Sequence, residues 1–570
     1  MTTSVPSAEH GRGFTCAGSD DRVTEDHSPT PADSIRHICL GQALDDAAAL
    51  WADEIGWVFD DQPISFREMR DRSIRAAHAL TALGVGRGDF IAALAPNIPE
   101  YGYVIFGAAL LGAVVTPINT RSRHVEIRHS LVHGDTTILF TVDRFLKQDY
   151  RTILADVLGS EAVSAEGEVD SAAAPKLRRI VGFPGFEGPG ALSFAGFLAL
   201  GTSAGDAPPE PPAGQTWRDP VLLQYTSGTT ALPKGALLNH CMVLNYGVGF
   251  ATGMGVGRGD PMLNTQPFYH VGGSCAALPL PLCLGCRVVI PSYYDPERIL
   301  ALIERERCVA RTGFAAMYLT EVASPAFARY DTSSIRAAWY NGPVGLVDYV
   351  RQATGIPEFI QIYGATEGGG TGGRLADSLE SRTRTCGRAL AGTAIAIADL
   401  ETRKMLSPGK PGEILVRGWM QMNGYHKQPD ETAKVLQPDG WLRTGDIGLL
   451  DEDGFLHFVG RIKNMIRVGG ENVSAEEVEA VLMSHAKIKA AAVIGVPDDR
   501  LQEVVMAIVE PEMGETLSEQ EVISYCASQM ANFRVPRHVR FIDTWPLTGS
   551  GKIHYQALRE RYAAVSSADA

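Results

Sequence analysis

The sequence predicts an α/β fold with a large N-terminal body of sheets covered by helices and a small α+β unit at the C-terminal end. From about residue 45, helical and strand-like segments alternate along the chain, as they do where helices cover sheets. The length of 570 residues also exceeds what one compact domain usually holds, so at least one smaller unit is expected.

The first elements of the body can be assigned from local signals. Ser65 and Glu68 form a capping-box pattern that begins the helix FREMRDRSIRAAHALTALG, and the strand DFIAALAP follows. Asn97 and Pro99 are expected to begin the next helix. The apolar run 103–118 is shorter than the roughly 20 residues of a membrane-spanning helix, so it predicts a buried helix leading into a strand.

The texture of the sequence changes near Gly460. A strand-like start, the helix AEEVEAVLMSH, the strand AAAVIGV and the helix LSEQEVISYCASQM predict a small α+β unit. We therefore expect a disordered tail at 1–37, which lacks the apolar stretch of a signal peptide, a large domain at 38–460 and a small domain at 461–570.

Charge and cysteine content narrow the possible partners. A net charge of −15 disfavours nucleic acid and anionic membranes, so an anionic substrate needs local positive charge. Nine scattered cysteines fit a reduced cytoplasm better than a disulfide framework. Cys283 and Cys286 form a CxxC without a second ligand pair nearby, which favours core cysteines over a zinc or redox site.

The segment VLLQYTSGTTALPKG at 221–235 is predicted to bind phosphates. An apolar strand leads into small hydroxyl and glycine residues, whose amides and hydroxyls can converge on phosphate oxygens beside a lysine. The P-loop spacing GxxxxGKS/T is absent, and a polar surface turn is the alternative for such a loop alone. The residues assigned here are Thr226, Ser227, Gly228, Thr229, Thr230 and Lys234.

The string YTSGTTALPKG resembles the phosphate-binding loop of the adenylate-forming superfamily, which includes acyl-CoA synthetases, peptide-synthetase adenylation domains and beetle luciferases. Four further segments resemble motifs of that superfamily, in the same order: YNGPVG at 340–345, QIYGATEGGG at 361–370, DGWLRTGDIG at 439–448 and PLTGSGKIHYQALRE at 546–560. The resemblance covers about residues 45 to 560. It implies activation of a carboxylic acid by ATP and Mg²⁺ and transfer of the acyl group to coenzyme A.

The resemblance implies roles for residues that contact ATP. Tyr363, beside Gly364, would stack on adenine, Thr366 would contact the α-phosphate, and Glu367 would hold magnesium together with Thr226. A threonine and glutamate after a strand are also a common helix start, which is the alternative in isolation.

The later motifs supply residues that would bind the ribose and act on the reacting groups. Asp446 would accept hydrogen bonds from both ribose hydroxyls, with Arg461 as its second partner, although a DG-rich turn alone indicates only a hairpin. Lys552 would offset the repulsion between carboxylate and α-phosphate and stabilise the transition state. The alternative for Lys552 is a lysine in a mobile surface loop.

The turn YNGPVG matches the motif less closely. Asn341, Gly342 and Pro343 stand where the superfamily more often has two small residues against adenine and the acyl group.

The acid is predicted to be hydrophobic. The stretch 267–286 contains no acidic residue to pair with an amino acid's ammonium group. Its PFYHVGG string resembles acyl- and aryl-CoA synthetases, in which His270 would lie beside the carboxylate or gate the pocket, so His270 joins Thr366 and Lys552 as a catalytic candidate. A core histidine satisfied by backbone is the alternative. The pocket candidates are His270, Val271, Trp339, Tyr340, Gly342, Gly368, Gly369 and Gly370, which favour a fatty, aryl or polycyclic acid.

Two half-reactions use one carbonyl, and the resemblance implies that the small α+β domain at 461–570 is mobile and rotates between them. The resemblance puts the hinge at Lys463 and lets Gly469 and Gly470 line the pantetheine tunnel. Two rival functions stay open: an acyl-AMP ligase that loads a carrier protein, and a non-catalytic nucleotide-binding module. We expect a cytoplasmic enzyme without an integral membrane segment, acting on small molecules and not on nucleic acid. The oligomeric state is open, with a homodimer as one alternative.

Overall fold

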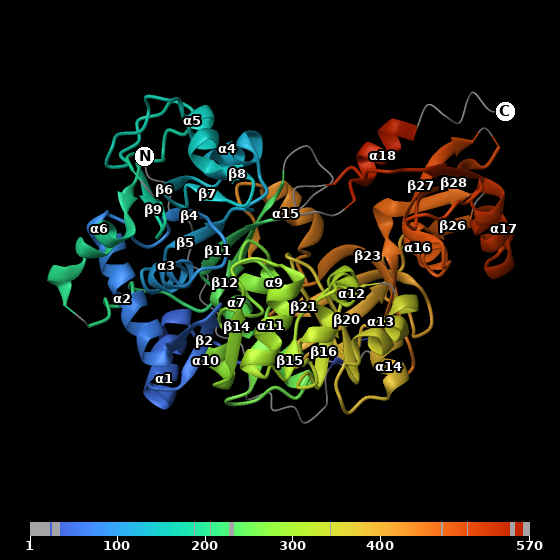
Figure 1. The fold of residues 1–570 in the computed structure, drawn as a ribbon, viewed down its shortest axis with the longest axis horizontal. Coiled ribbons are helices and arrows are strands. Elements are labelled where there is room, and N and C mark those ends of the chain that lie inside the picture. Colours follow the sequence, from blue (N-terminus) through green and yellow to red (C-terminus); the bar gives the residue numbers. More distant parts are fainter. Residues whose placement is uncertain are drawn as a thin grey trace.

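The computed structural model describes residues 23–25, 35–186, 188–205, 207–226, 233–342, 344–468, 471–498, 500–547 and 553–562. A large body and a smaller C-terminal unit, coloured orange to red, lie side by side (Figure 1). Both contain helices and strands, so the predicted α/β class with a small C-terminal domain is confirmed.

The first sheet of the body carries the predicted phosphate loop. Its strand order is β10-β9-β6-β4-β5-β11-β12-β22. The strands from β10 to β11 pair in parallel, and β12 and β22 add antiparallel pairs at one edge. The bounds are β4 (Phe90–Leu94), β5 (Val114–Pro117), β6 (Thr136–Thr141), β9 (Arg179–Gly182), β10 (Leu192–Ser193), β11 (Pro220–Tyr225), β12 (Gly235–Asn239) and β22 (Gly424–Tyr425).

A second sheet carries the segments 340–345 and 361–370. Its order is β19-β18-β17-β16-β15-β13-β14-β2-β3, and β17 through β2 pair in parallel. Ligands of open α/β sheets bind beyond the carboxyl ends of parallel strands, which here is where 341–342 and 364–367 lie. The bounds are β2 (Ile55–Phe59), β3 (Gln62–Ser65), β13 (Pro261–Leu263), β14 (Arg287–Ile290), β15 (Ala310–Arg311), β16 (Ala337–Tyr340), β17 (Glu358–Gly364), β18 (Gly369–Gly372) and β19 (Arg388–Ala389).

A third, antiparallel sheet completes the body with β1 (Val23–Glu25), β20 (Thr393–Ala398), β21 (Gly412–Gly418), β23 (Leu442–Leu450) and β24 (Leu456–Arg461). In its register Asp446 of β23 lies opposite Arg461 of β24. Strand β1 pairs with β20, so the predicted disordered tail does not hold for these three residues, whose backbone satisfies its hydrogen bonds on a sheet edge. Residues 1–22 and 26–34 lie outside the described part of the chain.

Side-chain caps begin several helices of the body, among them the helix predicted at Ser65. Ser65 caps α2 by accepting a hydrogen bond from Glu68 N at 3.1 Å, and Asp295 caps α11, which buries one apolar face. The helices are α1 (Leu40–Trp51), α2 (Phe66–Ala82), α3 (Pro99–Leu110), α4 (His124–His133), α5 (Tyr150–Leu158), α6 (Phe194–Ala199), α7 (His240–Asn245), α8 (Val248–Gly253), α9 (Val271–Ser274), α10 (Leu280–Leu284), α11 (Pro296–Glu306), α12 (Ala315–Ala323), α13 (Val347–Thr354), α14 (Leu379–Arg384) and α15 (Pro429–Val435).

The apolar run 103–118 forms the buried end of α3 and strand β5, as predicted. Within the described ranges no helix combines the length and apolar character needed to cross a membrane. Asn97, however, does not cap α3, because Ile98 occupies that position. The Asn97 side chain instead donates to the carbonyls of Gln266 and Pro291 and accepts from Phe268 N, which fixes the chain just before His270.

The C-terminal unit has cores of its own. Its strands pair in the order β26-β25-β28-β27, with β29 beside β28, and its apolar residues form two clusters separate from those of the body. A separate core is what an independent domain requires. The elements are β25 (Met465–Val468), β26 (Glu471–Ser474), α16 (Ala475–Met483), β27 (Ile488–Asp498), β28 (Gln502–Pro511), α17 (Glu519–Gln529), β29 (His538–Phe541) and α18 (Tyr555–Tyr562).

Every cysteine within the described ranges is free. Cys286 is fully buried and Cys283 packs against the same main cluster, which agrees with the prediction of core cysteines. Burial raises the pKa of the Cys283 thiol to about 12, so this thiol stays protonated at neutral pH.

Candidate active site

The phosphate loop rises from a hydrogen-bonded stem. Tyr225 of β11 pairs with Gly235 of β12, and Thr226 N donates to Lys234 O at 2.9 Å. The Tyr225 hydroxyl lies 2.9 Å from His133 Nδ1 on α4. The stem therefore fixes both ends of the loop, while the predicted phosphate ligands Ser227, Gly228, Thr229 and Thr230 lie outside the described residues.

Lys234 leaves this stem toward α15. Its ammonium group forms an ion pair with Glu431 and lies 5.0 Å above the ring of Tyr425. Glu431 also pairs with Lys434. The hydrogen bonds from Lys234 and then Lys434 lower the pKa of Glu431 to about 2, so this carboxylate is ionised at neutral pH.

Glu367, the predicted magnesium ligand, lies in the turn between β17 and β18. Its Oε1 accepts a hydrogen bond of 2.9 Å from the Tyr425 hydroxyl, and its carbonyl accepts from Met422 N at 2.9 Å. Burial, followed by the Glu367 charge, raises the pKa of Tyr425, so the phenol keeps its proton. Tyr425 thus contacts both Lys234 and Glu367.

The residues predicted for adenosine are in direct contact with one another. The Tyr363 hydroxyl donates to Asp446 Oδ2 at 2.8 Å, and Arg461 Nε lies 3.2 Å from Asp446 Oδ1. Burial raises the pKa of Asp446, and the Arg461 charge opposes this effect. An added Cβ on Gly364 would approach the Tyr246 hydroxyl to 2.8 Å, so a larger residue would crowd this turn.

Thr366 lies in the same turn, which is closed by Ala365 N donating to Gly368 O at 2.7 Å. Asn341 follows β16 and is exposed, and its carbonyl accepts from Ala315 N at 3.1 Å. An added Cβ on Gly342 would lie 2.6 Å from the Ala315 Cβ, so this position tolerates no side chain without rearrangement. Pro343 falls outside the described residues.

His270 stands at the start of α9. Its Nδ1 accepts a hydrogen bond of 3.1 Å from Gly272 N, so the proton of the neutral ring is on Nε2. This backbone contact fits the alternative of a core histidine satisfied by backbone. Val271 beside it is buried.

Two further acyl-pocket candidates, Trp339 and Tyr340, lie on opposite faces of the second sheet. Trp339 packs edge to face on Phe250 of α8, with ring centroids 5.7 Å apart, and is 4% exposed. Its indole nitrogen has no hydrogen-bond partner among the described residues. Tyr340 belongs to the cluster on the opposite face. Gly368 packs against β23 and the chain at Met420, since an added Cβ would lie 2.5 Å from Leu442 Cδ2.

The predicted hinge lies where the body ends. Lys463 follows β24 in a short 3₁₀ turn, and its carbonyl accepts from Arg559 of α18 at 3.5 Å. Lys552, Gly469 and Gly470 lie outside the described residues, but the flanking Leu547 and Ile553 form an antiparallel bridge.

Helix α18 begins three residues after Lys552. There the Tyr555 hydroxyl donates to Glu479 Oε1 at 2.7 Å, and burial raises the pKa of Glu479 to about 8.

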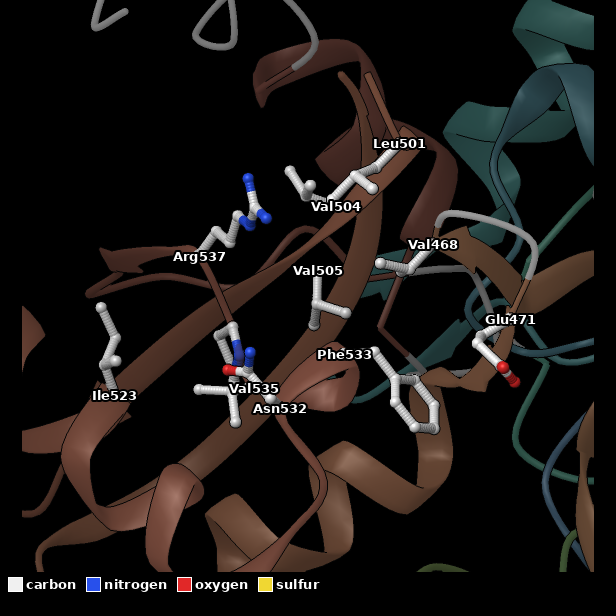
Figure 2. Close-up of a pocket in the computed structure, with 11 residues that line it drawn as sticks. Val468, Glu471, Leu501, Val504, Val505, Ile523, Asn532, Phe533, Val535 and Arg537 are labelled. Carbon is white, nitrogen blue, oxygen red and sulfur yellow. The ribbon is translucent and has the colours of Figure 1, made fainter. Parts of the chain in front are cut away.

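A cavity of about 480 Å³ lies in the C-terminal unit, apart from Lys234 and Asp446. Figure 2 shows Val505, Val535 and Phe533 along it, with the Arg537 guanidinium at one side. Val468 and Glu471, which flank 469–470, also line it. The cavity therefore adjoins the segment predicted for coenzyme A.

Two residues that contact the predicted site were missed from the sequence, Tyr425 and Glu431. Both lie in the string GYHKQPDET, whose proline and acidic residues indicate only the start of a helix. Nothing in that string signals a contact with Lys234, which is 197 positions away.

The fold and the site define an adenylate-forming ligase. A family model described as AMP-binding enzyme matches residues 44–426, and the model of the AMP-binding enzyme C-terminal domain matches 477–552. The first match spans well over half of the chain, so the protein belongs to the AMP-binding enzyme family.

Curated relatives and solved structures agree with this membership. The chain is 34% identical to a methyl-dioxo-octahydro-indenyl-propanoyl:CoA ligase of Mycobacterium tuberculosis, over 91% of this chain and 98% of the relative. It is 31% identical to a Bacillus subtilis protein named as the acyl-CoA synthetase YngI, over 92% and 97%. The structure of ATP-bound MatB from Rhodopseudomonas palustris superimposes with a TM-score of 0.78 at 25% identity, covering 92% of this chain and all of that one.

Proposed function

We propose that this protein is an AMP-forming acid–thiol ligase that converts a hydrophobic carboxylic acid into its coenzyme A thioester. The observation that carries the proposal is the meeting of three groups from three sheets: Lys234 on the loop stem, Glu367 beside Tyr425, and the contact of Tyr363 with Asp446 and Arg461. These groups offer a cation, a metal-binding carboxylate and a sugar-binding carboxylate within one region.

ATP would be bound by three groups of residues. The loop residues Thr226 to Thr230 and Lys234 would contact the phosphates, Tyr363 with the turn Asn341, Gly342 and Pro343 would contact adenine, and Asp446 with Arg461 would hold the ribose. The donor set fits magnesium, because Glu367 supplies a carboxylate and Thr226 a hydroxyl, both hard oxygen ligands. Bound Mg²⁺ would neutralise phosphate charge and orient the polyphosphate.

In the first half-reaction the substrate carboxylate attacks the α-phosphorus. A carboxylate oxygen forms the new bond to phosphorus, the bond between the α- and β-phosphates breaks, and pyrophosphate leaves with the electron pair. Lys552 and Thr366 would stabilise charge on the α-phosphate, and His270 would lie beside the carboxylate and orient it.

In the second half-reaction the thiolate of coenzyme A attacks the acyl carbonyl. The carbon–sulfur bond forms, the carbon–oxygen bond to AMP breaks, and the thiol proton passes to solvent. Lys552 and the thiol both need this carbonyl, so we propose that residues 461–570 form the mobile domain and rotate about Lys463 against 38–460. Gly469 and Gly470 would then line the thiol's path.

The acid is proposed to be fatty, aryl or polycyclic. The relatives named above are an acyl-CoA synthetase and a ligase for a bicyclic propanoate. The candidates Val271 and Trp339 are apolar or aromatic and buried, which suits a hydrophobic chain or ring. We further propose a cytoplasmic enzyme, in keeping with its free cysteines, and a homodimer that size-exclusion chromatography with light scattering would test.

The test is release of AMP with ATP, Mg²⁺ and coenzyme A across a panel of fatty, aryl and polycyclic acids. We expect AMP and acyl-CoA in equal amounts for at least one class. Acyl-AMP formation without thioester, restored by an acyl carrier protein, would favour the carrier-loading alternative. Absence of pyrophosphate exchange with every acid would favour the non-catalytic module.

A further inference from the structure

Residues 420–431, here called the strap, join the two halves of the predicted phosphate site. On one side Gly424 and Tyr425 pair with β12, and His426 N donates to Gly235 O at 2.8 Å. On the other side Gly369 N donates to Met420 O at 3.3 Å and Met422 N to Glu367 O. The strap backbone is therefore bonded both to the stem that carries Lys234 and to the turn that carries Glu367.

Two side chains of the strap repeat this connection. The Tyr425 hydroxyl holds the Glu367 carboxylate while its ring lies under the Lys234 ammonium group. Glu431, at the end of the strap, forms an ion pair with the same ammonium group. One segment thus restrains both the cation proposed to bind phosphate and the carboxylate proposed to hold magnesium.

We infer that Tyr425 and Glu431 are positioning residues for adenylation, which set the place of Lys234 relative to Glu367 before ATP binds. The inference rests on the proposed function and adds residues to it. Lysine has a long, flexible side chain, and ordering it in advance removes part of the entropy that ATP binding would otherwise lose. The ring face of Tyr425 and the carboxylate of Glu431 together favour one orientation of the Lys234 side chain.

The charges are consistent with this role. A carboxylate beside a phosphate site repels the ligand unless it is neutralised. Glu431 pairs with both Lys234 and Lys434, so the three groups together keep one positive charge for the polyphosphate. In addition, the backbone N–H of Tyr425 donates to Thr432 Oγ1 at 2.8 Å, which connects the strap to α15.

The test compares Glu431→Gln and Tyr425→Phe with Asp430→Asn, which makes the same charge change as Glu431→Gln on the neighbouring exposed residue of α15. We expect Glu431→Gln to weaken binding of a non-hydrolysable ATP analogue, measured by calorimetry, and to raise KM for ATP by about two- to fivefold, as for the loss of one partly exposed charge contact. Tyr425→Phe is expected to act in the same direction. Glu431→Asp should recover part of the loss, and Asp430→Asn should match the wild type.

A half-reaction and a double mutant separate positioning from general damage. Thioester formation from supplied acyl-AMP does not use the polyphosphate contacts, so it should stay within about twofold of wild type in Glu431→Gln. In a Lys234→Ala background, Glu431→Gln should add no further loss of analogue affinity, because it acts through that lysine.

The inference is overturned if Glu431→Gln binds the analogue as the wild type does, if both half-reactions fall together, or if its effect adds fully to that of Lys234→Ala. The proposed function fails by a different result, the absence of acyl-AMP formation by the wild type. Analogue binding by the variants still tests the strap in that case.

Discussion

Replacing Tyr363 with phenylalanine is expected to move the acidic limb of the activity profile to higher pH. The hydroxyl of Tyr363 donates to Asp446 Oδ2 at 2.8 Å, and it lowers the pKa of a carboxylate that burial has raised. A hydrogen bond to a charged group is worth about 1.5–3 kcal/mol. Because 1.4 kcal/mol is a factor of ten in an equilibrium constant, the loss raises the pKa of Asp446 and weakens the preference for its ionised form by about ten- to a hundredfold.

The sign follows from what Asp446 must do. Only the ionised carboxylate accepts hydrogen bonds from both ribose hydroxyls, so ATP use is lost as pH falls through the pKa of Asp446. The variant keeps the aromatic ring, so stacking on adenine is retained, but its activity should fall at a higher pH than that of the wild type.

The assay is kcat/KM for ATP in acid-dependent pyrophosphate exchange, measured from pH 5 upward. Tyr318→Phe is a matched control, because Tyr318 is also buried but donates to the carbonyl of Trp339. We expect the control to leave the acidic limb in place. If Tyr363→Phe lowers activity by the same factor at every pH, the proposed link between this hydroxyl and the charge of Asp446 is refuted.

Three further predictions concern other parts of the molecule. Lys552→Ala should slow adenylation by about 10²-fold or more while sparing thioester formation from supplied acyl-AMP; equal losses would contradict the two-conformation scheme. Glu479 has a folded-state pKa near 8, above its unfolded value, so its contribution to stability is complete below the unfolded pKa and is lost as pH rises toward 8. Glu479→Gln should flatten that decline in denaturant titrations, and an unchanged slope would refute it. Glu321→Ala leaves the buried Arg311 without its ion pair and should cost about 3–5 kcal/mol, seen as a lower Tm.

Local patterns predicted the elements that depend on local physics. The cap at Ser65, the buried helix and strand at 103–118, and the elements α16, β27 and α17 of the C-terminal unit all follow from neighbours a few positions apart, whereas β28, β29 and α18 were not predicted. Asn97 was misassigned for the same reason. Its residue type fits a helix cap, but its side chain meets the backbone of Gln266, which is 169 positions away.

The site was only partly predictable because its motifs name residues and not their mutual contacts. Sequence reasoning selected Tyr363 and Asp446 separately, whereas the fold joins them in a hydrogen bond across 83 positions. Tyr425 and Glu431 were not selected at all, since their contacts with Glu367 and Lys234 depend on where the strap lies in three dimensions. A sequence motif identifies residues that contact the ligand. It does not identify residues that position those side chains.

The predicted hinge at Lys463 lies close in sequence to Arg461, a predicted ribose-binding residue. Arg461 ends β24, where its backbone pairs with Asp446 and its side chain reaches the same carboxylate. Lys463 follows two residues later, and its carbonyl is held by Arg559 of α18, the helix that begins just after the Lys552 segment. The C-terminal unit has apolar clusters of its own, so the proposed rotation about Lys463 would leave the core of each part intact. Ribose held at Asp446 would therefore remain bound to the body while the unit that carries Lys552 moves, which lets AMP stay anchored through both half-reactions.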